Sequence, residues 1–161
     1  MKAKVITRLF TIALTITLIG IFGFVQAQDK PSDNMEIVKE KIRSDKKLLV
    51  ATNMQLTESE ANAFWPVYES YQAELAKLRD REIKLIEKFA ASYETMSDDV
   101  AKKLLDDSLS IDLSHQKLRQ SYLSNFRGVL SDKKVARYYQ LESKINAVME
   151  YELARRIPLV Q

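Results

Sequence analysis

The sequence contains no cysteine, and its 161 residues include only three glycines, three prolines and one histidine. Without cysteine the chain can form neither a disulfide nor a thiolate metal site. Two of the glycines lie within the first 23 residues, so the rest of the chain holds only Gly128. Because glycine and proline are the strongest breakers of regular structure, a chain with so few of them is expected to form long helices.

Catalytic motifs are lacking as well. No glycine-rich phosphate loop is present, and no serine stands in the strand–turn–helix context of a nucleophile elbow. With one histidine and no cysteine, the sequence offers no pairing of a nucleophile with a base. We therefore expect no enzymatic activity and no cofactor.

The first residues follow the order of a secretory signal peptide. A positively charged start is followed by an apolar run over 9–24 and then by the small residues of Val25-Gln26-Ala27. The basic residues of the start are Lys2, Lys4 and Arg8. The run is shorter than the roughly 20 residues of a membrane-spanning helix. This order predicts cleavage after Ala27 and export to the periplasm, with membrane contact only during export; the rival interpretation is an uncleaved membrane anchor.

Removal of the signal peptide changes the charge balance. It holds three of the 25 basic residues and none of the 22 acidic ones, so residues 28–161 carry equal numbers of each sign. Nucleic-acid-binding domains usually carry an excess of clustered Lys and Arg. The sequence therefore predicts no nucleic-acid partner, and its remaining length suits a single domain over 28–161.

Helix-start signals divide this domain into four helices, predicted over 35–52, 58–93, 98–127 and 132–157. Asp33 or Asn34 can cap the first helix. Thr57 and Glu60 form a capping box preceded by an apolar staple residue, Leu56. The third helix begins with Ser97, and two acidic residues follow it at Asp98 and Asp99, where the helix dipole favours negative charge.

The fourth helix starts in a similar way. Ser131 stands at the capping position, and Leu130 with Val135 forms the staple pair. When the chain is shifted by 74 residues, Leu56-Thr57-Glu58 aligns with Leu130-Ser131-Asp132, and aromatic residues follow both segments. The alignment is explained equally well by duplication or by two similar helix starts, since these residue types are common there.

The second predicted helix carries an apolar seam at heptad spacing. Seven of its eight seam positions are apolar or aromatic, and Glu82 is the exception. Pro66 lies past its first turn and should kink it. A helix of this length in so short a chain predicts an extended, bent hairpin with an uncovered apolar face, and hence a dimer.

His115 is the only histidine and falls on the seam of the third predicted helix. Three interpretations apply. It is a metal ligand, which would need carboxylates or a second subunit to complete the site; it is a pH sensor, because histidine titrates near neutral pH; or it lies at the edge of the helix packing.

The helix starts resemble those of the Spy/CpxP family of exported helical proteins, which carry an LTxxQ motif. The motif stands here as Leu56-Thr57-Glu58-Ser59-Glu60 and as Leu130-Ser131-Asp132-Lys133-Lys134. Glu60 and Lys134 occupy the glutamine position, and Ser131 replaces threonine. The segment Phe64-Trp65-Pro66-Val67-Tyr68 is also similar to a subgroup of these proteins.

The resemblance implies a bent helical hairpin that pairs into an antiparallel, cradle-shaped dimer. It implies a periplasmic, chaperone-like function in envelope stress, in which the cradle holds unfolded proteins. The alternatives are a dedicated accessory or inhibitor of an envelope sensor protein and, third, a metal sensor or buffer. Composition alone makes five cations candidates for client contact at the rim of the cradle: Lys77, Lys84, Lys88, Arg119 and Arg127.

Overall fold

The computed structural model describes residues 31–160, and its side chains from residue 41 onward. The helices are α2 (Pro31–Met54), α3 (Glu58–Ser92), α4 (Asp98–Ser121), α5 (Leu123–Arg127) and α6 (Asp132–Ala154), with a 3-10 turn, η2 (Tyr93–Thr95), between α3 and α4. No strand occurs within 31–160, which confirms the all-α class and the four long helices. The predicted signal peptide and its cleavage site lie outside the described residues.

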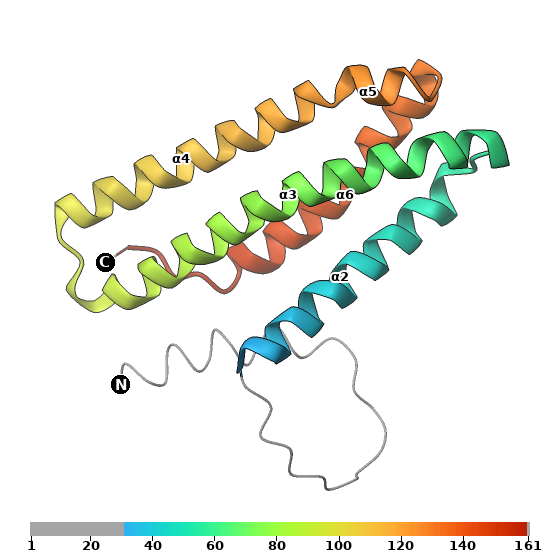
Figure 1. The fold of residues 1–161 in the computed structure, drawn as a ribbon. Coiled ribbons are helices and arrows are strands. Elements are labelled where there is room, and N and C mark those ends of the chain that lie inside the picture. The colour runs from blue at the N-terminus through green and yellow to red at the C-terminus, as the bar shows by residue number, and fades with distance from the viewer. Residues whose placement is uncertain (1–30, 161) are drawn as a thin grey trace, which may run out of the picture.

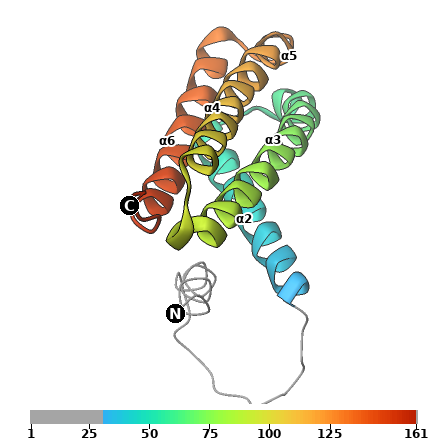
Figure 2. The same ribbon diagram turned by 90° about the vertical axis from the view of Figure 1, so that its left-hand side faces the viewer.

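The four long helices alternate in direction. Figure 1 shows α2 and α4 running one way and α3 and α6 the other. Helices α3 and α4 lie side by side and are joined through η2, while α2 packs on α6. Figure 2, a quarter turn away, shows α4 and α6 on one side of α3. We call the end that carries α5 and the α2–α3 connection the aromatic end, and the end at η2 the turn end.

The capping box at the start of α3 is confirmed. Thr57 accepts a hydrogen bond from the backbone N–H of Glu60 at 3.3 Å, and the Glu60 carboxylate accepts one from the Thr57 N–H at 2.8 Å. Ser97 likewise accepts from the N–H of Val100 at 3.4 Å and begins α4. These bonds satisfy N–H groups that the first helical turn leaves without partners.

The start of α6 is held differently. Ser131 occupies the capping position, but its side chain accepts no hydrogen bond from the helix. Leu130 and Val135 are 7% and 3% exposed, so both members of the predicted staple are buried. The Lys134 ammonium contacts the Glu60 carboxylate and donates to the backbone carbonyl of Gln55. Packing and a cross-helix ion pair therefore fix this start.

Three of the four predicted helix ranges differ from the structure by more than one residue. Helix α2 begins at Pro31, ahead of the expected caps Asp33 and Asn34, because proline is favoured in the first turn. Helix α6 ends at Ala154 rather than at residue 157, since Pro158 disfavours helical geometry in the residue before it.

The third error is the expected single helix over 98–127, which divides at Tyr122 into α4 and α5. The Tyr122 hydroxyl lies 2.8 Å from Ser70 Oγ, and its ring packs edge-on to Tyr71 at 5.3 Å. The break lets the following turn place Phe126, which is fully buried, in the core. Side-chain packing, not a breaker residue, explains the division.

The best-packed part of the core lies at the aromatic end. Phe64, Tyr68, Phe126 and Tyr138 are each at most 1% exposed, and the ring centroids of five of their six pairs lie 4.6–6.1 Å apart. Edge-on and tilted aromatic pairs at such distances are favourable beyond their buried area. Helix α3 continues through Pro66, whose side chain is exposed on the opposite side from this cluster.

A buried ion pair joins α2 to α6 beside this core. Lys46 Nζ lies 2.8 Å from Glu142 Oε2, and the two side chains are 8% and 3% exposed. Gln72 donates to Glu142 Oε1 at 3.1 Å, and the Tyr138 hydroxyl donates to the same oxygen at 3.2 Å. Burial lowers the pKa of Lys46, and the attraction to Glu142 offsets this only in part. Long-range charge pairing thus ties the first and last helices together.

Candidate functional site

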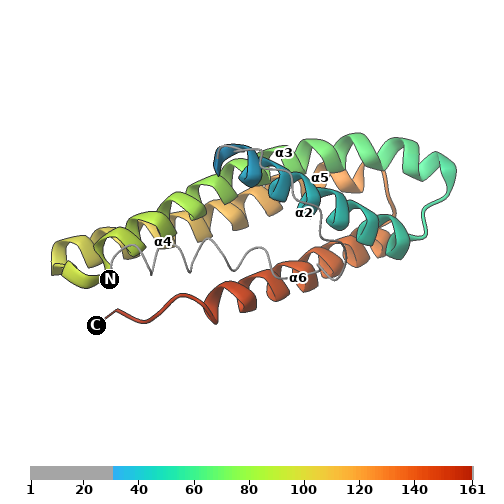
Figure 3. The same cartoon turned by 90° about the horizontal axis from the view of Figure 1, so that it is seen from below.

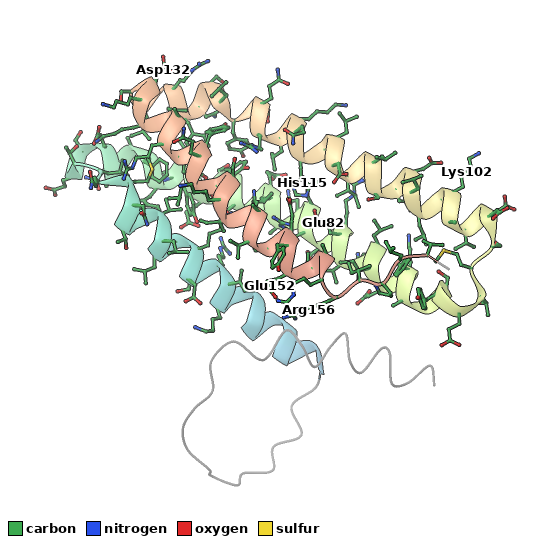
Figure 4. The ribbon with its side chains drawn as sticks, turned by 180° about the vertical axis from the view of Figure 1, so that it is seen from behind. Glu82, Lys102, His115, Asp132, Glu152 and Arg156 are labelled. Carbon is green, nitrogen blue, oxygen red and sulfur yellow. The ribbon has the colours of Figure 1, made fainter. Side chains whose placement is uncertain are left out.

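Glu82 and His115, the polar residues on the apolar seams of α3 and α4, meet near the middle of the molecule. His115 Nε2 lies 2.7 Å from Glu82 Oε1, and the side chains are 18% and 24% exposed. The distance is that of an ion pair, although the direction is not that of a hydrogen bond. Figure 4 shows both side chains between α3, α4 and α6. His115 thus contacts an acidic partner inside the helix packing.

Arg79 completes this polar cluster. Its guanidinium lies 2.9 Å from Glu82 Oε2 and donates to Asn146 Oδ1 of α6 at 3.0 Å. Burial raises the pKa of Glu82, but the contacts with His115 and Arg79 outweigh that effect and hold it below its ordinary value. The cluster therefore links three helices through an ionised carboxylate.

This donor set does not suit a metal ion. Within the described residues no three His, Cys, Asp or Glu side chains come together as ligands. Here Glu82 and His115 offer two donors, and the Arg79 guanidinium adds positive charge beside them. Zinc normally takes three or four protein ligands. The side chain that His115 contacts is a carboxylate, that of Glu82, and not a hydroxyl nucleophile.

An apolar cleft of about 420 Å³ opens next to the polar cluster, toward the turn end. Helix α3 provides one wall, α4 the other, and the segment after α6 lies along it. Arg79 and Glu82 stand among the lining residues, and the apolar lining includes Leu85, Ile86, Phe89, Met96, Leu104, Leu105, Ile111, Leu153, Ile157 and Val160. The cleft is thus mainly apolar, with charge at one end, as many binding pockets are.

A row of exposed leucines runs along α4 from the mouth of this cleft. Leu105, Leu109 and Leu113 are 60%, 57% and 54% exposed. Their spacing of four residues places them on successive turns of one side of the helix. We call these three side chains the leucine row. Contiguous exposed apolar surface of this kind marks interaction sites in soluble proteins.

The predicted rim cations do not form a single patch. Lys77, Lys84 and Lys88 share one exposed side of α3, since they are spaced by seven and four residues. Lys77 pairs with Glu74 of its own helix at 2.6 Å, and Lys88 lies 3.9 Å from Asp107 of α4. These three cations therefore remain accessible at the α3–α4 edge.

The other two predicted cations face elsewhere. Arg119 stacks over the Tyr139 ring of α6 at 5.5 Å and donates to Ser143 Oγ at 3.1 Å. Arg127 pairs with Asp132 at 2.8 Å across the α5–α6 turn. Their positions support structural roles, and the structure does not bring them to the cleft.

Sequence reasoning missed the cleft and the leucine row. The leucines fall outside the seam that was read from heptad spacing, although their i, i+4 repeat in a charged helix was a visible signal. The apolar segment Ile157–Val160 after the last helix was a second signal.

Helix composition and three comparisons complete the description of the site. No helix within residues 31–160 is long and apolar enough to cross a membrane. The chain matches no protein-family model, no curated protein and no solved structure.

Proposed function

We propose that this protein is a periplasmic, chaperone-like binding protein that holds apolar segments of non-native proteins on its helical surface. The observation that supports this most strongly is the leucine row beside an open apolar cleft. A soluble domain exposes so much contiguous leucine surface at a free-energy cost of roughly 25 cal/mol per Å² of apolar area. A surface that covers these leucines by binding recovers that energy.

The charges around this surface suit loose and reversible contact. Lys84 and Lys88 flank the cleft on α3, and Asp106 and Asp107 are spaced among the leucines on α4. Mixed charges raise the rate of encounter more than they raise affinity. A holding protein needs that combination, because it must release its client.

We further propose that the protein forms a bent hairpin dimer, as the resemblance to Spy/CpxP proteins implies. The support is physical: the molecule packs its core at one end and leaves apolar side chains uncovered at the other. Sedimentation velocity of residues 28–161 should show a concentration-dependent dimer; a monomer at all accessible concentrations would contradict it.

The function is tested by light scattering of a chemically denatured client protein. Residues 28–161 should suppress aggregation at near-stoichiometric ratio, and the double variant Leu109→Glu/Leu113→Glu should lose most of that effect. Ser110→Glu/Gln116→Glu is the matched control, because it adds the same two charges at exposed positions of α4 without removing a leucine.

Two results would contradict the proposal. If the wild-type protein leaves aggregation unchanged at several-fold excess, it is not a holding protein, and crosslinking in the envelope for one dedicated sensor partner becomes the next experiment. If the leucine variants suppress aggregation as well as the wild type does, the leucine row is not the binding surface.

A further inference from the structure

The chain's own C-terminal segment forms part of the wall of the apolar cleft. Pro158 cannot continue a helix, so the chain leaves α6 after Ala154 and runs on without helical structure. Figure 1 shows this stretch passing back toward the η2 turn. Ile157 and Val160 line the cleft together with residues of α3 and α4. We call Ile157–Val160 the tail segment.

The tail segment is held loosely. Ile157 is half-buried, Val160 is 56% exposed and Leu159 is 89% exposed. A fully docked apolar peptide would bury such side chains, because the removal of apolar surface from water is favourable. The tail segment therefore leaves much of the favourable free energy of apolar burial in the cleft unrealised.

The charges of the lining further define the occupant. Three carboxylates, Glu82, Asp112 and Glu150, line the cleft against one guanidinium, Arg79. Asp112 of α4 and Glu150 of α6 are both exposed. The tail segment itself follows two basic residues, Arg155 and Arg156, which contact Glu152. An apolar peptide that carries basic residues matches this lining.

We propose that the cleft is a peptide-binding site for extended apolar segments with a basic flank, and that the tail segment covers it as a competing internal ligand. This inference rests on the proposed function, for which it names the chemistry of the bound segment. An internal ligand acts at a high effective concentration, so even loose docking lowers the apparent affinity for an external peptide.

The test uses a fluorescein-labelled peptide of residues 155–161 and fluorescence polarisation. Deletion of residues 157–161 leaves every helix intact, because α6 ends at Ala154. The truncated chain should bind the peptide at least about tenfold more tightly than the complete chain. The double variant Ile157→Asp/Val160→Asp, which keeps the chain length, should show the same gain.

A pair of matched substitutions locates the binding site in the truncated chain. Leu105→Glu places a charge at the mouth of the cleft and should abolish peptide binding. Leu48→Glu, on α2, removes a similarly exposed leucine that does not line the cleft (67% against 60% exposed) and should not alter binding. Circular dichroism checks that both variants remain helical.

Three outcomes would overturn the inference. Equal affinity of the complete and truncated chains would show that the tail segment does not compete. Equal effects of the two glutamate substitutions would place binding elsewhere. A dimer that is lost on truncation would show that the tail segment docks on a second copy instead.

The result also separates this inference from the proposed function. A chain that binds the peptide as described but does not suppress client aggregation contradicts only the function. If neither Leu105→Glu nor the truncation changes the suppression of aggregation, the result contradicts only the inference that the cleft binds the client.

Discussion

At the scale of single residues, the Lys46–Glu142 pair is a buried contact that requires both of its charged partners. Its members lie on α2 and α6 and are almost fully buried. Taking two charges out of water is costly, and removing one partner leaves the other charge buried and unpaired. We therefore expect the pair to favour one docking position of α2 on α6 more than it adds net stability.

Lys46→Met should lower the free energy of unfolding by about 3–5 kcal/mol. Lys46→Met/Glu142→Gln should recover most of that loss, because a neutral glutamine keeps a hydrogen-bond acceptor for Gln72 and Tyr138. Urea denaturation of the two variants measures both values. If the double variant loses as much unfolding free energy as Lys46→Met, or more, then the unpaired charge of Glu142 does not cause the loss in the single variant.

Glu82 gives a second prediction at this scale. Its folded pKa lies below the ordinary value of 4.5, so its ionised form stabilises the fold above about pH 4.5, and that contribution is lost as the pH falls through the folded pKa. The stability of the wild type should therefore decline more steeply below pH 4.5 than that of Glu82→Gln. Glu87→Gln, an exposed position on the same helix, serves as the control and should follow the wild type.

At the scale of helices, the two LTxxQ-like starts differ in how they hold the chain. Thr57→Ala removes a capping hydrogen bond and should cost about 1 kcal/mol. Ser131→Ala removes a side chain that caps nothing and should cost less than about 0.5 kcal/mol. Thermal unfolding of the two variants provides the comparison. An equal loss for both would mean that Ser131 caps α6 in solution.

The weak 74-residue repeat has a spatial counterpart. Helices α3 and α6 run in the same direction, and their starts contact residue for residue: Glu60 meets Lys134, and the Phe64 ring packs edge-on to Tyr138 at 5.3 Å. The hydrogen bond from the Lys134 ammonium holds the pKa of the Glu60 carboxyl below its ordinary value. The two departures from glutamine in the motif are thus opposite charges that pair.

Helix existence was predictable from sequence because caps and scarce breakers are local signals. Heptad spacing marked Glu82 and His115 as polar positions on two seams, but their contact depends on the relative shift of α3 and α4, which no local rule sets. The buried Lys46–Glu142 pair and the break at Tyr122 depend on long-range packing in the same way. Gln55, whose φ of 49° ends α2 in the left-handed region, gave no glycine or asparagine signal.

At the scale of the whole molecule, packing is uneven from end to end. The buried aromatic cluster and the Lys46–Glu142 pair lie at or near the aromatic end, whereas the cleft lies toward the turn end and is bordered by exposed leucines. Regions with few buried contacts open locally at lower free energy than the core. The turn end is therefore the adaptable part of the protein.

Native-state hydrogen exchange should reveal this gradient within one helix. Backbone amides of α3 near Tyr68 should exchange only through global unfolding, whereas those near Phe89 should exchange through smaller openings and respond less to denaturant. Uniform protection along α3 would contradict the gradient. Leu48→Glu, at an exposed position on α2, should leave the pattern along α3 unchanged.

Trp65, the only tryptophan, packs edge-on to Phe64 at 5.1 Å and to Tyr68 at 5.2 Å, and Lys47 of α2 lies over its ring at 5.2 Å. Its emission therefore responds to the seating of α2 against α3, whereas circular dichroism reports the total helix content. If the fluorescence changes at a lower denaturant concentration than the dichroism, α2 detaches before the rest unfolds. The fluorescence of Trp65 thus reports on the docking of α2, the first described helix, against α3.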